Sequence, residues 1–251
     1  MTDVRVVALD ELDRAVVDQV HELLHRCIPP DELITGEELH AAHGRGPDAE
    51  PSAVVLREGS PVAVMLAERF AGGRVLLLSY VAVEPAARGA GIGAALVGEV
   101  LEDWADGAVV VAEVAHPRWH PGDADTGDGA SRLRFYGRLG ARLLPAPYVQ
   151  PSLRPGLPRV PGLLLIRLDA GGPVPPEPLE LFLEEYYSAC EGPASLQDPV
   201  VTTLLSRVGE LADPSTSWHL DRHVELPGPS DALAALPGRA GDVWATGSRR
   251  S

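Results

Sequence analysis

A glycine-rich loop between Leu76 and Val100 has the residue types that bind a phosphate group. The stretch LLLSYVAVEPAARGAGIGAALVGEV passes from a β-rich apolar run through this loop directly into a helical pattern. Glycines let the backbone come close to a ligand, and the N–H groups of a helix beginning near Ile92 would point into the loop with the positive end of the helix dipole behind them. We therefore expect the loop to hold the pyrophosphate of a cofactor.

The order of residues in the loop distinguishes between cofactors. A dinucleotide site has G-x-G-x-x-G near the chain start, and a Walker loop has a lysine after its last glycine; neither pattern is present here. The loop instead resembles the acetyl-CoA signature of the GNAT superfamily of N-acetyltransferases, V-x-V-x-P-x-x-[RQ]-x-x-G-x-[GA]. Every fixed position of that signature is met: Val81, Val83, Pro85, Arg88, Gly91 and Gly93. The resemblance implies acetyl-CoA as acyl donor, bound by Val81, Ala82, Val83, Arg88, Gly89, Ala90, Gly91, Ile92 and Gly93.

A second segment, residues 131–143, resembles the A-x-x-[FL]-Y-x-[KR]-x-G-F segment of the same family. It reads as a short helix that ends at Gly140 and is followed by a strand. The resemblance implies that Tyr136 lies close to the CoA sulfur and donates a proton to the leaving thiolate. Arg132 and Ala141 depart from the pattern, and neither departure affects this chemistry.

An amine acceptor also needs a base, because it is protonated near neutral pH. The first candidate is Glu113, in the segment Ala-Glu-Val-Ala, which resembles the L-E-V-R strand of family members that acetylate protein N-termini. The structural alternative is that Glu113 pairs with an arginine such as Arg134. Because the flanking residues depart from L-E-V-R, the inference to a peptide substrate is weakened. Glu68, on the strand before the loop, is the second candidate, and backbone N–H groups near Val81–Val83 are expected to stabilise the oxyanion.

The segment from His116 to Gly129, HPRWHPGDADTGDG, is longer than the corresponding connection in the family it resembles. It would lie beside the place where acyl group and amine meet, which makes it a candidate for substrate selection. We name Trp119, His116, His120 and Asp123 as candidate substrate-binding residues, with a solvated loop as an equal alternative. The H-x-x-x-H pairs in the chain lack a third ligand, so no metal is expected.

Composition restricts the function classes. The chain has 251 residues and a net charge of −15, which disfavours nucleic-acid binding and suits a cationic substrate. Its two cysteines, Cys27 and Cys190, form neither a disulfide framework nor a metal-binding spacing, and we expect both to be spectators in the reaction. An apolar run of membrane-spanning length and a signal-peptide pattern are both missing, so we expect a cytoplasmic protein without membrane partners.

The order of expected elements predicts an α/β (α+β) fold: a GNAT-like mixed, largely antiparallel central sheet flanked by helices, with a C-terminal helical extension. Expected strands cover residues 4–8, 53–57, 62–70, 75–83, 108–114 and 163–168, and expected helices cover residues 10–27, 36–43, 92–104 and 131–139. The predicted division is an acyltransferase domain at 1–170, a helical extension at 171–226 and an irregular tail at 227–251.

The resemblance does not extend beyond Asp169. The expected helices at 179–189 and 199–211 could pack on the same chain, cap the amine pocket or form a homodimer interface, of which packing on the same chain is favoured. The predicted function is direct transfer of an acetyl group from acetyl-CoA to a primary amine, first of a small molecule and second of a peptide or protein. The alternative from another class is a non-catalytic acyl-CoA-binding regulatory module.

Overall fold

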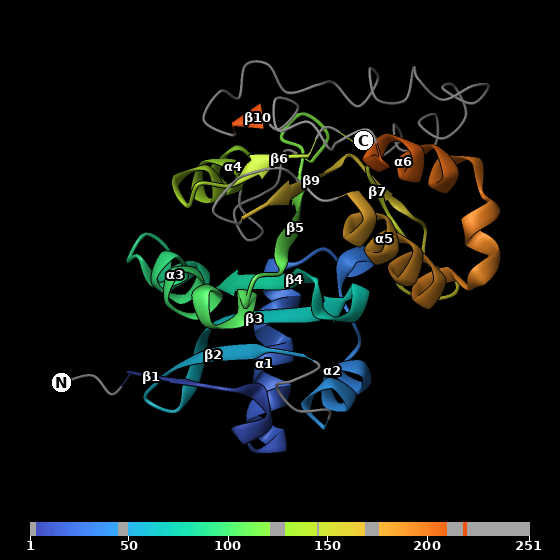
Figure 1. Cartoon of the computed structure of the whole chain (residues 1–251). Helices are drawn as coiled ribbons and strands as arrows, with labels where there is room; N and C mark the ends of the chain where they lie inside the picture. The colour runs from blue at the N-terminus through green and yellow to red at the C-terminus, as the bar shows by residue number, and fades with distance from the viewer. Residues whose placement is uncertain are drawn as a thin grey trace, which may run out of the picture.

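The computed structural model describes residues 4–44, 50–120, 129–144, 146–168, 176–209 and 218–219. Its main feature is one mixed sheet of eight strands in the order β1-β2-β3-β4-β5-β9-β6-β10, with β7 and β8 forming a separate hairpin (Figure 1). The strands are β1 (Val4–Val7), β2 (Ser52–Arg57), β3 (Ser60–Phe70), β4 (Val75–Val83), β5 (Val109–Ala115), β6 (Arg142–Leu143), β7 (Val149–Gln150), β8 (Val160–Pro161), β9 (Leu163–Arg167) and β10 (Trp218–His219).

Within the described residues, six α-helices flank the sheet. They are α1 (Arg14–Cys27), α2 (Gly36–His43), α3 (Ile92–Ala105), α4 (Gly129–Arg138), α5 (Pro176–Glu191) and α6 (Pro199–Gly209). Every neighbouring strand pair in the large sheet is antiparallel except β4 and β5, which are parallel. The predicted fold class, a largely antiparallel sheet with helices on its faces and at its C-terminal side, is therefore confirmed.

A tight turn joins the strands β2 and β3. The β2–β3 hairpin turns at Glu58 and Gly59, whose φ angles of +52° and +80° match the two positive values of a tight hairpin turn.

The first helix begins later than the sequence predicted. It was expected from Asp10 but begins at Arg14, because Leu12 and Asp13 both take extended backbone angles after a short 3-10 helix at Leu9–Glu11.

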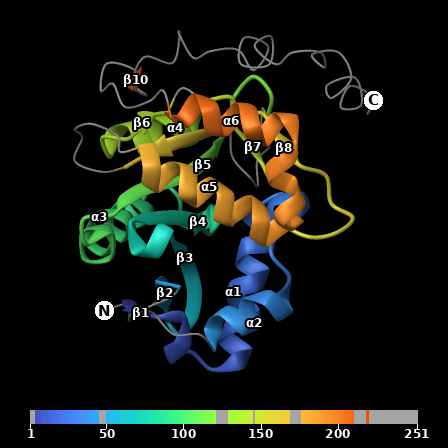
Figure 2. The same ribbon diagram turned by 45° about the vertical axis from the view of Figure 1, so that its right-hand side comes forward.

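The alternation of side chains along the strands assigns the helices to two faces. One cluster packs α3 and α4 against one face, and includes Val110, Ala112 and Val114 of β5. Two clusters share the other face: α1 and α2 cover β2, β3 and the end of β4, while α5 and α6 cover the start of β4 together with β5 and β9. Figure 2 shows α3 on one side of β2–β4 and α1 and α2 on the other.

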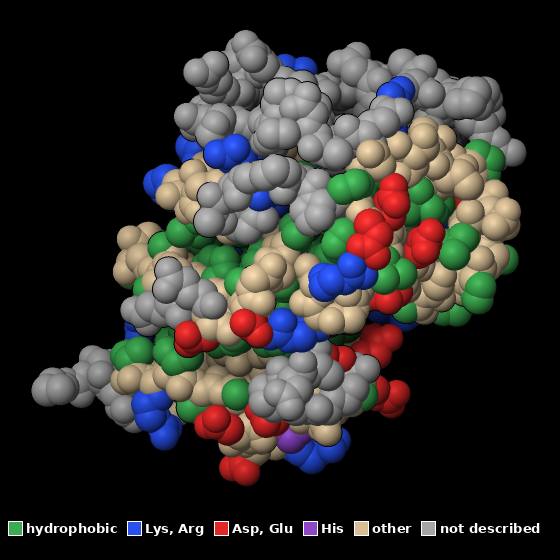
Figure 3. Space-filling model, viewed as in Figure 1, with side chains coloured by type: hydrophobic (Ala, Val, Ile, Leu, Met, Phe, Trp, Pro, Cys, Tyr) green, Lys and Arg blue, Asp and Glu red, His purple; other side chains and the backbone are tan. Residues whose placement is uncertain are grey.

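The C-terminal helices belong to this core. Several side chains of the two helices are fully buried against Val75 and Leu77 of β4 and Val111 of β5. They are Leu179, Phe182 and Leu183 of α5 and Leu204 of α6. The outward side of α5 carries the exposed acidic side chains Glu177, Glu184 and Glu185. Figure 3 shows acidic side chains, in red, over this part of the molecule. Of the three predicted placements of this extension, packing on the same chain is the one observed.

Candidate active site

The sheet opens between β4 and β5, and a cavity lies at this opening. The two strands pair only from Val75–Leu78 to Val109–Ala112. Opposite β3, Ser79 is an extra residue in β4, because Leu66 pairs with Tyr80 while Ala67 pairs with Leu78. Such a bulge increases the local twist and redirects the strand. Beyond Leu78, β4 diverges from β5 and leaves a space in the sheet.

A cavity of about 550 Å³ fills this space. It is lined by Cys27, Ile28, Glu32, Leu78, Ser79, Tyr80, Val81, Ala82, Val83, Ala87, Arg88, Gly89, Gly91, Ile92, Gly93, Ala94, Glu113, Val114, Ala115, Ser131, Arg132, Phe135, Tyr136, Arg138 and Gln150. We call Arg88, Gly89, Gly91 and Gly93 the glycine end of the cavity, and Glu32, Glu113 and Gln150 its carboxylate end. Of the nine predicted cofactor-binding residues, all except Ala90 line the cavity.

The backbone of the glycine end allows a ligand to come close to its N–H groups. Gly89 and Gly91 have φ angles of +81° and +80°, which residues with a Cβ rarely adopt. Gly91 precedes the first turn of α3, and no side chain caps that turn. Its N–H groups have no partner inside the helix, as in every α-helix, so they are available to an anion. At Gly93, an added Cβ would lie 3.2 Å from Val83 Cγ2, so a side chain there would disturb the packing of α3 on β4.

Arg88 is the cation of the glycine end. Arg88 Nε donates to the carbonyl of Val83 at 3.1 Å, and its Nη2 lies 3.5 Å from Cys27 Sγ, so the guanidinium is held at the end of β4. Arg138 lies on α4, is exposed and also lines the cavity. Burial raises the pKa of the Cys27 thiol above its usual value, so the thiol is not activated as a nucleophile.

Glu113 is the central residue of the carboxylate end. Its Oε1 accepts a hydrogen bond from the Tyr148 hydroxyl, and its Oε2 accepts one from Gln150 Nε2 at 2.8 Å. Desolvation raises the pKa of Glu113 from 4.5 to about 7; these two hydrogen bonds act in the opposite direction, and the charges of Glu32 and Glu68 raise it further. Among the described residues, the Glu113 carboxylate is therefore bound by Tyr148 and Gln150, and not by an arginine as in the alternative given above.

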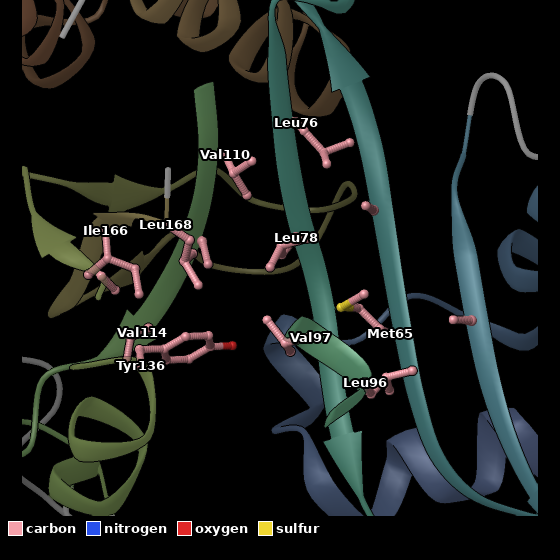
Figure 4. Close-up of a cluster of buried hydrophobic side chains, with 14 of the residues drawn as sticks. Met65, Leu76, Leu78, Leu96, Val97, Val110, Val114, Tyr136, Ile166 and Leu168 are labelled. Atoms are coloured by element: carbon pink, nitrogen blue, oxygen red, sulfur yellow. The ribbon is translucent and has the colours of Figure 1, made fainter. Parts of the chain in front are cut away.

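Tyr136 reaches the cavity from the other face of the sheet. It lies on α4 in the same core cluster as Val114 of β5. Because side chains along a strand point alternately to the two faces, Glu113 points to the opposite face, which α5 covers. In Figure 4 the Tyr136 hydroxyl points away from α4 toward the space between β5 and β4. Burial raises its pKa to about 12, although the charge of Arg132 acts to lower it. The hydroxyl therefore stays protonated at neutral pH, and the cavity joins the two faces through the opening of the sheet.

Glu68, the second candidate base, does not line the cavity. Its carboxylate accepts a hydrogen bond from Ser79 Oγ at 2.8 Å, and Ser79 is the bulge residue that does line it. Glu68 is therefore separated from the cavity by the side chain of Ser79.

The described part of the predicted substrate loop lies beside the β8–β9 turn. The N–H of His116 donates to the carbonyl of Gly162 at 3.0 Å, and His120 Nε2 lies 2.8 Å from the carbonyl oxygen of Pro161. His116 is buried, and Trp119 is 37% exposed. None of these three residues lines the cavity, and Asp123 lies outside the described residues.

Sequence reasoning missed Glu32 and Gln150. Glu32 ends the short 3-10 helix Pro30–Glu32 between α1 and α2, and Gln150 lies in β7, a two-residue strand. Glu32 follows a Pro-Pro-Asp stop signal and Gln150 lies in an irregular proline-containing stretch, so neither is in a motif. The one available signal was chemical: a polar residue flanked by apolar ones, as in Tyr148-Val149-Gln150.

Comparisons with known proteins agree with this geometry. Residues 17–118 match the family model described as acetyltransferase (GNAT) family. A GNAT-family protein from Bacteroides thetaiotaomicron superposes with a TM-score of 0.54 and 21% identity, over 73% of this chain and 98% of that one. The loading GNATL domain of CurA from Lyngbya majuscula gives a TM-score of 0.50 and 17% identity, over 66% of this chain and 98% of that one. The search of curated protein sequences found no match.

Residues 17–118 thus match the acetyltransferase (GNAT) family that the sequence predicted, and the fold agrees with that match. The part of the chain that the structure describes has no group of three or more His, Cys, Asp or Glu residues that could hold a metal ion. Nor does any of its helices have the length and apolar character needed to cross a membrane.

Proposed function

We propose that the protein transfers an acyl group, in the first place acetyl, from the CoA thioester to a primary amine of a small molecule in one ternary complex. The observation that carries the proposal is that Glu113 and Tyr136, from opposite faces of the sheet, line one cavity with the glycine loop. A base and an acid on either side of one reacting centre are what direct transfer requires.

The glycine end fits the diphosphate of CoA. Its unpaired N–H groups and left-handed glycines provide a backbone cradle for an anion, and Arg88 and Arg138 add positive charge beside it. From Ser79 onward, β4 has no strand partner in β5. Its backbone groups on that side are available to an extended ligand segment, and the N–H groups near Val81–Val83 are our proposed oxyanion donors.

The chemistry divides between the two faces. Glu113 takes a proton from the acceptor ammonium or amine, whose nitrogen forms the new bond to the acyl carbon. As the carbon–sulfur bond breaks, Tyr136 gives its proton to the leaving sulfur. The nitrogen loses its second proton as the amide forms, and that proton, passed through solvent, restores Tyr136, while Glu113 releases the first proton to solvent. With a pKa of about 7, Glu113 is poised to accept a proton near neutral pH, and with a pKa of about 12 Tyr136 keeps a proton to donate.

A peptide or protein amine is the next acceptor class in this proposal. A non-catalytic acyl-CoA-binding module is the alternative from another class, and the presence of Glu113 and Tyr136 in the cavity disfavours it.

Calorimetric titration with acetyl-CoA, followed by assay of amine-dependent thiol release, tests the proposal. The proposal predicts saturable binding that is weakened in Arg88→Glu, and thiol release that depends on both the amine and Tyr136. Binding without release on any amine would favour the regulatory module, and absence of binding would contradict the proposal.

A further inference from the structure

Glu32 is a carboxylate held at the cavity wall by its backbone. The Tyr80 hydroxyl donates to the Glu32 carbonyl at 2.9 Å and accepts from the N–H of Ile34 at 3.0 Å, so Tyr80 fixes the backbone that leads from Glu32 to Ile34. Arg154 Nη1 donates to the carbonyl of Leu33 at 2.9 Å, which ties this segment to the stretch that follows Gln150. Within the described residues no hydrogen bond reaches the Glu32 carboxylate, although it lines the cavity.

The Glu32 carboxylate adds negative charge near Glu113. Glu32 and Glu68 are close enough to Glu113 to raise its pKa by repulsion. The positive groups that act on Glu32 are His120 and Arg132, and burial nevertheless dominates and raises its pKa. A cation placed between Glu32 and Glu113 would relieve this repulsion and would be attracted strongly, because the site is partly desolvated.

Gln150 supplies a second, independent sign of a ligand. Its side chain is only 5% exposed and lines the cavity, and its Nε2 donates to Glu113. Its Oε1 is buried and accepts no hydrogen bond from any described residue. A buried amide oxygen without a donor is unfavourable by about 1–3 kcal/mol, so an N–H donor brought by a ligand would be bound there.

We infer that Glu32 and Gln150 form a subsite for a second cationic, N–H-bearing group of the acceptor, so that the preferred substrate class is a diamine. This inference rests on the proposed function. Glu113 faces the amine that reacts, and the Glu32 carboxylate and Gln150 Oε1 accept hydrogen bonds from the N–H groups at the other end. A simple monoamine lacks those N–H groups, and an amino acid with a distal carboxylate is repelled.

The test compares three probes of matched chain length: 1,4-diaminobutane, n-butylamine and 4-aminobutanoate. The wild-type protein should prefer the diamine over the monoamine in kcat/KM by about tenfold or more, the size of one hydrogen-bonded charge interaction. Glu32→Gln should reduce that preference about tenfold, and Glu32→Lys should shift it toward 4-aminobutanoate. Glu37→Gln, on the exposed side of α2, is the matched control and should keep the wild-type preference.

Calorimetric titration with 1,4-diaminobutane, on the free protein and on the protein saturated with CoA, separates this inference from the proposed function. Diamine binding that weakens about tenfold in Glu32→Gln but not in Glu37→Gln supports the subsite, whether or not any amine is acetylated. An unchanged preference in Glu32→Gln, or no diamine binding to a protein that binds CoA, overturns the subsite and leaves the proposed function standing. Failure to bind CoA overturns the proposed function. In that case, diamine binding by the free protein still shows whether the subsite exists.

Discussion

The two ends of the cavity are built in different ways. The glycine end comes from one contiguous stretch, in which the end of β4 runs through Gly89 and Gly91 into α3, and the contacts that we propose for it with CoA are mainly backbone groups. The carboxylate end combines Glu32, Glu113 and Gln150, three side chains from segments that are far apart in the chain. The first is a local motif that can be copied between proteins unchanged, whereas the second exists only once the whole sheet has formed.

This difference predicts where substitutions act. Changes at the glycine end should affect donor binding, and changes at the carboxylate end should affect the acceptor and the proton transfers. The two ends line one cavity but are made of different residues, so each class of change should leave the other function largely intact.

Glu113→Gln should give the largest loss of activity. Removal of the base should lower kcat/KM for the amine by about 10³-fold, while the affinity for acetyl-CoA changes little. In the wild-type protein kcat/KM should rise with pH and level off above about 7, because the carboxylate must be deprotonated to accept a proton. Steady-state assays with an amine that is neutral throughout the range measure this limb, which Glu113→Gln should lack.

Glu68→Gln is the matched control for Glu113→Gln, since Glu68 bonds Ser79 and stays outside the cavity. It should lower activity by less than about tenfold. A larger loss in Glu68→Gln than in Glu113→Gln would reverse the assignment of the base.

Tyr136→Phe should lower kcat by about 10²-fold, since the leaving sulfur then has to be protonated by water. The KM values for both substrates should change little, because the ring remains in its packed position beside Phe135. Single-turnover assays separate this effect from product release. An equal loss in KM and kcat would indicate a packing role for Tyr136 rather than proton donation.

Gly91→Ala, at a φ of +80°, should weaken acetyl-CoA binding by about tenfold, because a Cβ disfavours the left-handed backbone that aims the loop. Calorimetry measures the affinity. Gly98→Ala, within α3 and without contacts to an added Cβ, is the control and should bind normally. Equal affinities for both variants would show that the loop does not contact the donor.

Glu113→Gln should also stabilise the folded protein at pH 8. The folded-state pKa of about 7 exceeds the usual 4.5, so the folded state binds more protons between these values and wild-type stability falls as pH rises through that window. The variant should gain about 2 kcal/mol in the free energy of unfolding at pH 8 and nothing near pH 4, measured by urea denaturation. A stability loss at both values would mean that the carboxylate is a structural group.

Much of the fold could be predicted from the sequence because its signals are local. The run from Val75 to Val83, its glycine loop and the helix that follows were predicted with the strand bounds observed, since apolar β-branched residues, Pro85 and the glycines all act within a few residues. The short strands β7, β8 and β10 were not predicted, because a two-residue strand has no periodicity and depends on its partner.

The candidate site divides in the same way. Tyr136 and Glu113 were found through motifs, and the structure places both at the cavity, although their catalytic roles stay predictions. Glu32 and Gln150 could not be found, because what brings them to Glu113 is the bulge at Ser79, the contact of Tyr80 with Glu32 and the pairing of β7 with β8. The candidates His116, Trp119 and His120 follow β5 directly in the chain, yet hydrogen bonds of His116 and His120 to the β8–β9 turn hold that segment beside the cavity rather than in its wall.

The most direct test of the account is a crystal structure of the protein with CoA and an amine acceptor analogue. The account predicts a diphosphate within hydrogen-bond distance, about 3 Å, of the N–H groups around Gly91 and Ile92. It also predicts the CoA sulfur beside the Tyr136 hydroxyl and the analogue nitrogen beside Glu113. A diphosphate bound away from the glycine loop, or a sulfur that does not reach the opening between β4 and β5, would contradict it.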